Sequence, residues 1–326
     1  MSVNAPVHMK ILDKERWNMD KKFLYYLIKR VLLAIVTIFL VVTITFFIMN
    51  FIPGGPFMSE KSVSETTLAA LNAKFGLDKP IGEQYVNYLK GAATFDFGPS
   101  MKMDGRQVTD VIMEGFATSA KLGLIAAASA IVLGLIFGSL AAVYHNKIID
   151  RIIMVLSTAF VAMPSFIVAT LLLWIFCVQL KVLPANGQTA AGLILPVISL
   201  MLYPMAYIIR LTRSSMLDVL GQDYIRTAKA KGVAPSMVLF KHALRNAVTP
   251  VITYAGPMVA FILTGSLVVE KILAVPGLGK YFVSSIINRD YTMIMGTTIF
   301  LAVIVVVMML VSDILYKLFD PRVDLS

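Results

Sequence analysis

The sequence predicts an all-α, polytopic membrane protein. The chain of 326 residues is 58% hydrophobic and only 15% charged, with a mean hydropathy of +0.80, whereas a soluble domain is roughly 45–50% apolar and about 25% charged. The apolar residues fall into six stretches that lack Asp, Glu, Lys and Arg and are long enough to cross a bilayer. Basic residues concentrate in alternate connections between these stretches. A soluble globular enzyme and a disordered chain are therefore excluded.

Each of the six stretches meets the length that a membrane span requires. A helix rising 1.5 Å per residue needs about 20 apolar residues to cross a hydrocarbon core of roughly 30 Å. Pro164 in the third stretch, and Pro250 with Pro257 in the fifth, should kink their helices, since proline lacks a backbone donor. We expect spans over residues 31–52, 122–144, 152–180, 192–209, 246–269 and 291–316.

The charge of the connections predicts the orientation. Six spans place both termini on the same side, together with residues 145–151 and 210–245. These segments hold 18 basic and 9 acidic residues, against 11 and 10 on the opposite side. Short loops rich in Lys and Arg stay in the cytoplasm, so residues 1–30 and 317–326 are expected to be cytoplasmic tails. The same distribution explains a pI near 9.6 without nucleic acid as a partner.

Residues 53–121, on the opposite side, are predicted to form a small helical extracytoplasmic insert. Two amphipathic helices are expected, because apolar residues recur there at helical spacing. As alternatives, the insert is either a lid that packs on the spans or a docking surface for an external protein; residues 270–290 form the second extracytoplasmic loop. The first helix is expected to begin at a capping box of Ser62 and Glu65 and to end at Gly76, and the second to run from Pro80 to Gly91.

The cytoplasmic loop of residues 210–245 has its own helical periodicity. Met216, Leu220, Tyr224 and Ala228 recur every four residues and predict one apolar stripe. Gly232 should stop this helix, and a second one is expected to start at Pro235. One interpretation is a helix lying on lipid headgroups; a protein partner is favoured, because the stripe is narrow and rich in small residues.

The sequence lacks the residues that metal binding, catalysis, ATP binding and ion-coupled transport would require. The single Cys177 and three scattered histidines argue against a metal site, and no catalytic motif occurs. No phosphate-binding loop is present, and the six apolar stretches contain no Asp, Glu, Lys or Arg. The last of these stretches covers residues 291–312, and its helix is expected to continue past Asp313 to residue 316. We expect Lys121, Glu270 and Asp313, at the edges of spans, to reach water by snorkelling. Transport by this chain would therefore take its energy from a partner.

The 210–245 loop also carries a family resemblance. The segment DYIRTAKAKG at 223–232, followed by HALRNA at 242–247 and Pro250, resembles the coupling loop of ATP-binding-cassette (ABC) importer permeases of the dipeptide and oligopeptide class. The general permease pattern is E-A-A-x-x-x-G; here Arg226 and Thr227 occupy its first two positions, as in the peptide class. Residues 210–220, 276–279 and 288–291 also resemble this class. Residues 53–57, 96–100 and 119–123 resemble the oligopeptide permease B-type subunit in particular.

This resemblance implies a multi-pass subunit of the bacterial inner membrane, surrounded by lipid, that transports peptides and is not an enzyme. It implies a homologous second permease, two ATP-binding subunits that hold ATP and Mg, and an extracytoplasmic peptide-binding protein, with no cofactor in this chain. The helix of residues 217–232 would couple the spans to the ATPases. The coupling residues it implies are Leu217, Leu220, Asp223, Tyr224, Arg226, Thr227, Ala228 and Gly232.

Polar and small residues within the spans indicate a path and a packing surface. Gly134 and Gly138 form a G-x-x-x-G pattern that lets another helix approach closely, within the chain or from the partner permease. Polar side chains would line a substrate path or, alternatively, form interhelical hydrogen bonds; they are Thr253, Tyr254, Thr264, Ser266 and Ser165.

Two other functions are alternatives to a peptide permease. The protein could be a stand-alone channel or secondary carrier, or it could be an ABC importer permease for another small solute such as nickel.

Overall fold

The computed structural model describes the backbone of residues 7–57, 64–264 and 267–319, and the side chains of 25–57, 64–264 and 267–314. This part of the chain is helical, and its β pairing amounts to one isolated bridge between Pro99 and Gln107. Five helices are long and apolar enough to cross a membrane, and a sixth span results if one bent pair of helices counts as a single crossing. The predicted all-α membrane fold is confirmed.

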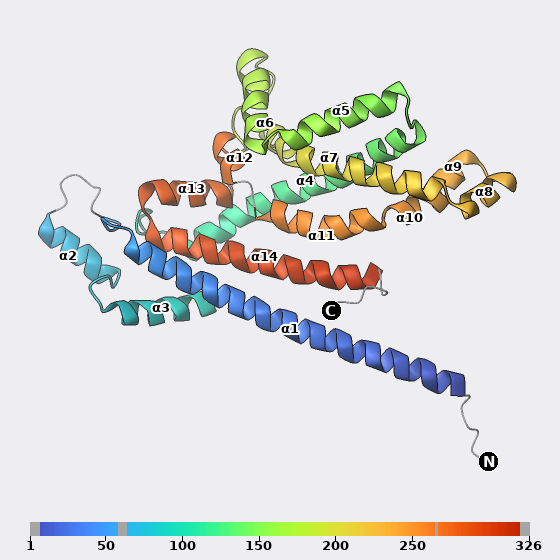
Figure 1. Ribbon diagram of the computed structural model, residues 1–326. Coiled ribbons are helices and arrows are strands. Elements are labelled where there is room, and N and C mark those ends of the chain that lie inside the picture. The colour runs from blue at the N-terminus through green and yellow to red at the C-terminus, as the bar shows by residue number, and fades with distance from the viewer. Residues whose placement is uncertain (1–6, 58–63, 265–266, 320–326) are drawn as a thin grey trace.

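The helices follow one another as shown in Figure 1. Their bounds are α1 Val7–Phe51, α2 Glu65–Lys74, α3 Ile81–Thr94, α4 Val108–Val143, α5 Ile148–Ala162, α6 Ser165–Leu172, a π-helical segment Leu173–Gln179, a 3-10 turn Ala191–Leu193, α7 Ile194–Leu220, α8 Asp223–Ala230, α9 Pro235–Met237, a second π-helical segment Val238–Leu244, α10 Arg245–Ala247, α11 Thr249–Leu263, α12 Leu267–Ile272, α13 Leu278–Asn288 and α14 Tyr291–Phe319.

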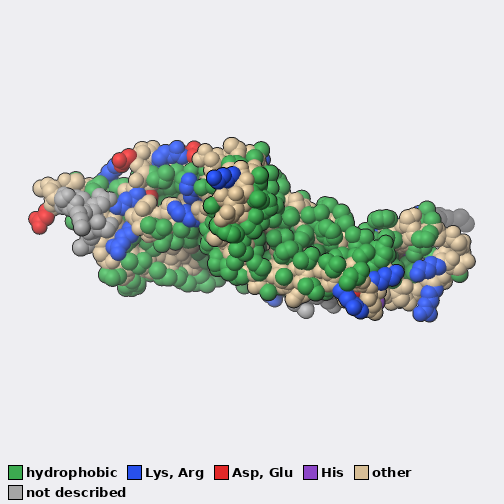
Figure 2. Space-filling view, turned by 90° about the horizontal axis from the view of Figure 1, so that it is seen from above, with side chains coloured by type: hydrophobic (Ala, Val, Ile, Leu, Met, Phe, Trp, Pro, Cys, Tyr) green, Lys and Arg blue, Asp and Glu red, His purple; other side chains and the backbone are tan. Residues whose placement is uncertain are grey.

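The connections gather at two ends of the molecule. At one end lie the start of α1, the end of α14, the α4–α5 turn and α8 to α10; at the other lie α2, α3, α12 and α13 (Figure 1). These are the two sets of segments that the charge distribution separates. Hydrophobic side chains cover the middle of the face seen in Figure 2, and Lys and Arg lie toward the ends.

The third predicted span, residues 152–180, is not a continuous helix. The chain bends by 105° between α5 and the run of α6 with its π-helical segment. Met163 between them has extended backbone, with ψ of 122°, because the ring of Pro164 disfavours helical geometry in the preceding residue. Helices α4 and α7, by contrast, are longer than the spans predicted for them. Charged residues end an apolar stretch of the sequence, but they do not end the helix.

The close approach of α4 to α7 is made by glycine. A Cβ atom on Gly134 would lie 2.6 Å from Cγ2 of Ile208, and one on Gly138 would lie 2.8 Å from the carbonyl oxygen of Ile209. Because the two glycines have no side chains, the backbone of α4 lies directly against residues of α7. The G-x-x-x-G pattern therefore faces a helix of the same chain.

Glu270 does not snorkel, contrary to the prediction. It is completely buried, and its carboxylate accepts hydrogen bonds from Ser119 Oγ at 2.9 Å and from the backbone N–H of Gly279 at 2.8 Å. Gly279 lies in the first turn of α13, where free N–H groups and the helix dipole stabilise an anion. Asp313 is paired with Arg30 at 3.2 Å, whereas Lys121 is exposed as expected.

Asp290 joins the insert to the spans. Its carboxylate accepts hydrogen bonds from the hydroxyl of Ser100, from the backbone N–H of Met101 at 3.2 Å and from the N–H of Met293 at 3.2 Å. It thereby caps α14 and holds the loop of residues 96–100 at once. Two segments far apart in the sequence are fixed together by one buried side chain.

The helices of the insert begin and end almost as predicted. The predicted capping box of Ser62 and Glu65 is wrong, because Ser64 caps α2 by accepting a hydrogen bond from the N–H of Thr67 at 3.2 Å, and Glu65 is the first residue of the helix. Ser62 itself lies outside the described residues. Gly76 ends α2 with φ of +66°, as expected. Helix α3 passes Gly91 and continues to Thr94. The chain then turns back onto Gly91, whose carbonyl accepts the N–H of Asp96 at 3.0 Å.

We predict that Glu270→Leu lowers the thermal stability of the purified protein. The substitution leaves the Ser119 hydroxyl and the Gly279 N–H buried without their acceptor, and each such group costs about 1–3 kcal/mol. The matched control is Glu114→Leu, which removes an exposed ion pair with Arg106 and should change stability by no more than about 0.5 kcal/mol. Equal melting midpoints for the two variants in detergent would contradict the role of Glu270.

Candidate functional site

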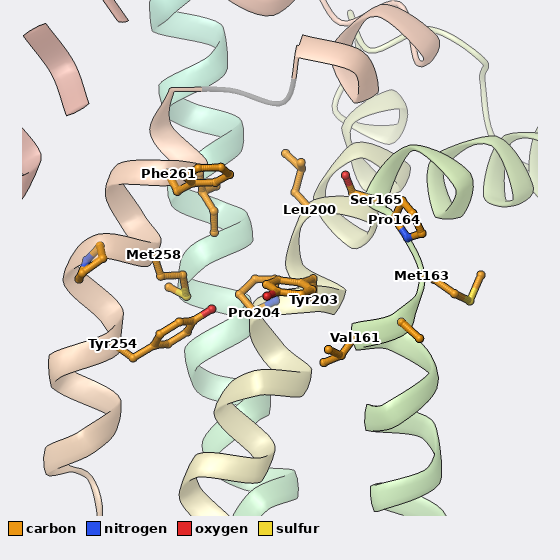
Figure 3. A pocket seen from close by; sticks show the side chains of 13 residues that line it. Val161, Met163, Pro164, Ser165, Leu200, Tyr203, Pro204, Tyr254, Met258 and Phe261 are labelled. Atoms are coloured by element: carbon orange, nitrogen blue, oxygen red, sulfur yellow. The ribbon is translucent and has the colours of Figure 1, made fainter. Parts of the chain in front are cut away.

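A cavity of about 620 Å³ lies between α5, α7 and α11 (Figure 3). Its volume is within the range of roughly 300–1,000 Å³ that small-molecule sites occupy. The break between α5 and α6 forms one wall, and α7 and α11 form the others. The lining residues are Val161, Ala162, Met163, Pro164, Ser165, Leu200, Tyr203, Pro204, Tyr254, Pro257, Met258, Phe261 and Ile262.

The bend at Pro164 makes room for this cavity. Helix α6 leaves the direction of α5 by 105° and still packs on α7. The bend exposes the turn of Met163 and Pro164 to the cavity, and Ser165 follows at the start of α6. The proline that the sequence marks as a kink thus shapes one wall of this cavity.

The cavity is apolar with a few hydroxyl groups. Tyr254 projects from α11 toward Tyr203 of α7 (Figure 3), and its ring centroid lies 4.4 Å from that of Tyr207. The lining contains no Asp, Glu, Lys, Arg or His. A ligand with an unpaired charge would lose its hydration here without compensation. The arrangement suits neutral polar groups joined to apolar or aromatic ones.

Only two of the predicted path residues meet in this cavity. Ser165 and Tyr254 line it from opposite walls. Thr253 faces a separate cavity of about 280 Å³, and Thr264 faces one of about 580 Å³ that Ser165 also borders. Ser266 lies outside the described residues.

The two threonine hydroxyls do not bridge helices in the described structure. Thr253 donates to the carbonyl of Thr249 at 3.2 Å, and Thr264 to that of Phe261 at 2.7 Å. Each bond stays within α11 or at its end. For these two residues the structure therefore shows neither the central path nor the interhelical bond considered for them.

Three aromatic residues near the cavity were missed by the prediction. Tyr203 and Tyr207 are four residues apart on α7, and the side chain of Phe261 is 82% exposed. The i, i+4 spacing of Tyr203 and Tyr207 inside an apolar stretch is a signal present in the sequence, whereas Phe261 has no such signal. Aromatic rings thus contribute more of this site than the Ser and Thr residues do.

The 210–245 loop folds over a small core of its own. Met216 of α7, Ile225 of α8, and Val238 and Ala243 of the second π-helical segment are buried together against the end of α4. This cluster packs α8 against the second π-helical segment and the end of α7. The loop therefore presents a formed helix and not a flexible connection.

The predicted stripe from Met216 to Ala228 is correct for three of its four residues, since Met216, Leu220 and Ala228 pack on the loop core. It is wrong for Tyr224, because the stripe spans two helices. Helix α7 ends at Leu220, and the turn at Gly221 and Gln222 resets the helical phase before α8. Ile225 becomes the buried residue, whereas Tyr224 is 44% exposed. The helix expected after Pro235 is present, mostly in π-helical form.

The eight predicted coupling residues divide into an inner and an outer set. Leu217, Leu220 and Ala228 pack against the loop core. The others are exposed on α8 or at its end, where Gly232 has φ of +73°. The outer set is Asp223, Tyr224, Arg226, Thr227 and Gly232.

Helix α8 is connected to two walls of the cavity. It follows α7 after a turn of two residues, and the hydroxyl of Tyr224 accepts a hydrogen bond from Asn246 Nδ2 at 2.9 Å. Asn246 lies in α10, directly before α11. Movement of α8 would thus act on α7 and α11 together.

We predict that Ile225→Asp detaches α8 from the loop core. A buried, unpaired carboxylate is costly. Each 1.4 kcal/mol by which it destabilises the packed loop raises the population of molecules with α8 detached about tenfold. Trypsin should then cut at Arg226, Lys229 and Lys231 at least about tenfold faster than in the parent. Thr227→Asp, on the exposed side of the same helix, is the control; similar cutting rates for both variants would contradict the packing.

Comparison with known proteins places this geometry in context. Residues 130–325 match the family described as "Binding-protein-dependent transport system inner membrane component", and residues 23–123 match the corresponding N-terminal family. The "Dipeptide transport system permease protein DppB" of Bacillus subtilis (strain 168) is 49% identical over 92% of this chain and 98% of its own length. The "Oligopeptide transport system permease protein OppB" of Haemophilus influenzae is 43% identical over 92% and 99%.

A solved structure shares the fold. The structure titled "Inward facing conformations of the MetNI methionine ABC transporter: CY5 native crystal form" aligns with a TM-score of 0.54 at 18% sequence identity. The alignment covers 64% of this chain and 95% of that one.

Proposed function

Because the chain belongs to the family of binding-protein-dependent transport system inner membrane components, we propose that it is the permease subunit of an ABC importer for dipeptides or oligopeptides. The 49% identity to a dipeptide permease over nearly the full length of both chains carries this conclusion. The chain is a transport subunit of the bacterial inner membrane and not an enzyme. Hydrolysis of ATP takes place on separate ATPase subunits.

The cavity between α5, α7 and α11 is the proposed peptide path through this half of the transporter. The neutral, polar peptide bonds and the apolar side chains of a peptide match a lining of tyrosine hydroxyls and apolar side chains. The charged termini of the peptide would take their partners outside this lining, for example on the second permease. The alternative of a nickel permease is not favoured, because this lining provides no imidazole, thiolate or carboxylate ligand for nickel. A homologous second permease completes the pathway.

The 210–245 loop is the proposed coupling element. Helix α8 presents Asp223, Arg226 and Thr227 outward for a groove of an ATP-binding subunit, and Ile225 anchors it from behind. ATP and Mg are bound by the two ATPases. Shifting a population from 1:99 to 99:1 takes about 5.5 kcal/mol of differential binding, which only a firmly anchored helix transmits. A stand-alone carrier would have no use for such a loop.

The orientation follows from this role. The end with α8, the α4–α5 turn and both chain termini faces the cytoplasm, and the end with α2, α3 and α13 faces outward. We assign the insert as the docking surface for the external peptide-binding protein. Asp290 and Ser100 fix it to α14, so a partner that binds it would act on the spans.

We predict that Gly232→Pro separates the ATPases from the permease. Gly232 has φ of +73°, which proline does not adopt because its ring fixes φ near −65°. Co-purification of the ATPases and peptide uptake should both fall at least about tenfold, while the spans still insert. Gly105→Pro is the control, since Gly105 has φ of +72° in the insert; equal loss of ATPases in both variants would contradict the coupling role.

We predict that Ser165→Trp blocks the peptide path. The indole ring would fill part of the cavity of about 620 Å³, so uptake of a tripeptide should fall at least about tenfold with the ATPases still bound. Thr253→Trp, in the separate cavity on the other side of α11, should retain most of the uptake. The assignment is refuted if Thr253→Trp blocks uptake and Ser165→Trp does not.

A further inference from the structure

A buried ion pair joins α5 to α7 at the end of the molecule that carries the 210–245 loop. The side chain of Asp150 is 4% exposed. Arg213 Nε lies 2.6 Å from its Oδ1, and Arg213 Nη2 lies 2.7 Å from its Oδ2. The backbone N–H of Asn146 also donates to Oδ2, at 2.9 Å. A two-pronged pair of this kind fixes orientation as well as distance.

Two further contacts lie next to the Asp150–Arg213 pair. His145, in the α4–α5 turn, lies with Nδ1 3.1 Å from Arg213 Nη2. About one turn earlier on α7, Arg210 Nη2 donates to the carbonyl of Ser157 at 3.4 Å. Helix α5 is therefore held to α7 at two levels, seven residues apart on α5.

Both helices lead from this contact to the cavity. Helix α5 ends in Val161 and Ala162, and α7 contributes Leu200, Tyr203 and Pro204. Of the two, α7 continues directly into the turn before α8. Arg213 thus lies on the helix that leads to α8, and Asp150 on the one whose far end forms the bent wall.

We propose that the Asp150–Arg213 pair is a positioning device that makes α5 follow α7 when α8 moves. The proposal rests on the proposed coupling function of the loop. With the pair intact, α5 and α7 move as one wall of the cavity, and α11 is the wall against which they move. The broken third span is carried along by its cytoplasmic end.

The chemistry of the pair suits this task better than apolar contact does. Apolar helices in a membrane gain no hydrophobic free energy by staying together, since lipid is as apolar as their side chains. Separating Asp150 from Arg213 would instead leave a buried carboxylate without its partner, which is strongly unfavourable. The pair therefore tolerates movement of both helices together and resists movement of one past the other.

Distances in the assembled wild-type transporter test the proposal without altering the pair. Spin labels would be placed at the exposed Ile152 of α5, Asp218 of α7 and Thr253 of α11, with Cys177→Ser as background. Between nucleotide-free and ATP-trapped states, the Ile152–Asp218 distance should change by less than about 2 Å. The Asp218–Thr253 distance should change by more. An Ile152–Asp218 change as large as the other would overturn the proposal.

A neutral replacement of the pair then tests its consequence. In Asp150→Asn with Arg213→Gln, the peptide taken up per ATP hydrolysed should fall roughly tenfold, with assembly and binding-protein-stimulated hydrolysis retained. The matched control is Arg30→Gln with Asp313→Asn, which removes the ion pair between α1 and α14 and should leave that ratio within about twofold.

The possible results distinguish a failure of the positioning role from a failure of the proposed peptide substrate. An unchanged ratio in the neutral Asp150 variant would reduce the pair to a structural staple and overturn the proposal. If instead the wild-type assembly takes up no peptide at all while its labels still report concerted α5 and α7, the proposed substrate is wrong and the positioning role stands.

Discussion

The close packing of α4 on α7 is the constraint on which the other helices depend. Gly134 and Gly138 bring the two backbones so near that no side chain fits between them. On one side of this pair, Met205 and Ile209 receive Ile153 and Phe160 of α5. On the other side, Ala127 and Ile208 receive Val251 and Met258 of α11. The cavity lies where α5 and α11 diverge around α7, so its walls are set by this one contact.

Buried carboxylates fix the outer part of the molecule to that frame. Glu270 ties the start of α13 to Ser119 of α4, and Asp290 ties the loop of residues 96–100 to the start of α14. Both are satisfied by backbone N–H groups and hydroxyls, which compensates for their burial. At the other end, Asp150 is paired with Arg213. The three carboxylates hold helices to one another, whereas the cavity between them has no charged side chain.

Much of this structure was predictable from the sequence, because apolar runs, prolines and glycines report local geometry. The spans, the end of α2 at Gly76 and the kink at Pro164 follow from such local signals. The size of that kink does not, since the angle depends on how α6 packs. The burial of Glu270 was also beyond prediction, because its partner Ser119 lies 151 residues away.

The candidate site was predicted in part for the same reason. Ser165 and Tyr254 stood out as polar residues within apolar spans, and both line the cavity. Thr253 has the same local signal but turns to another cavity, because the rotation of α11 is set by packing and not by its own sequence. On α8, the turn at Gly221 shifts the helical phase by enough to bury Ile225 and expose Tyr224. Side-chain orientations were therefore hardest to predict where one helix ends and the next begins.

The central claim is that this chain is one half of a peptide pathway driven by bound ATPases. Affinity purification of the tagged chain from gently solubilised native membranes, followed by identification of the co-purifying proteins, tests it most directly. The account predicts a second, homologous permease in equal amount and two ATP-binding subunits for each pair. Recovery of the chain alone, together with peptide uptake by that chain in liposomes without ATPases, would contradict it.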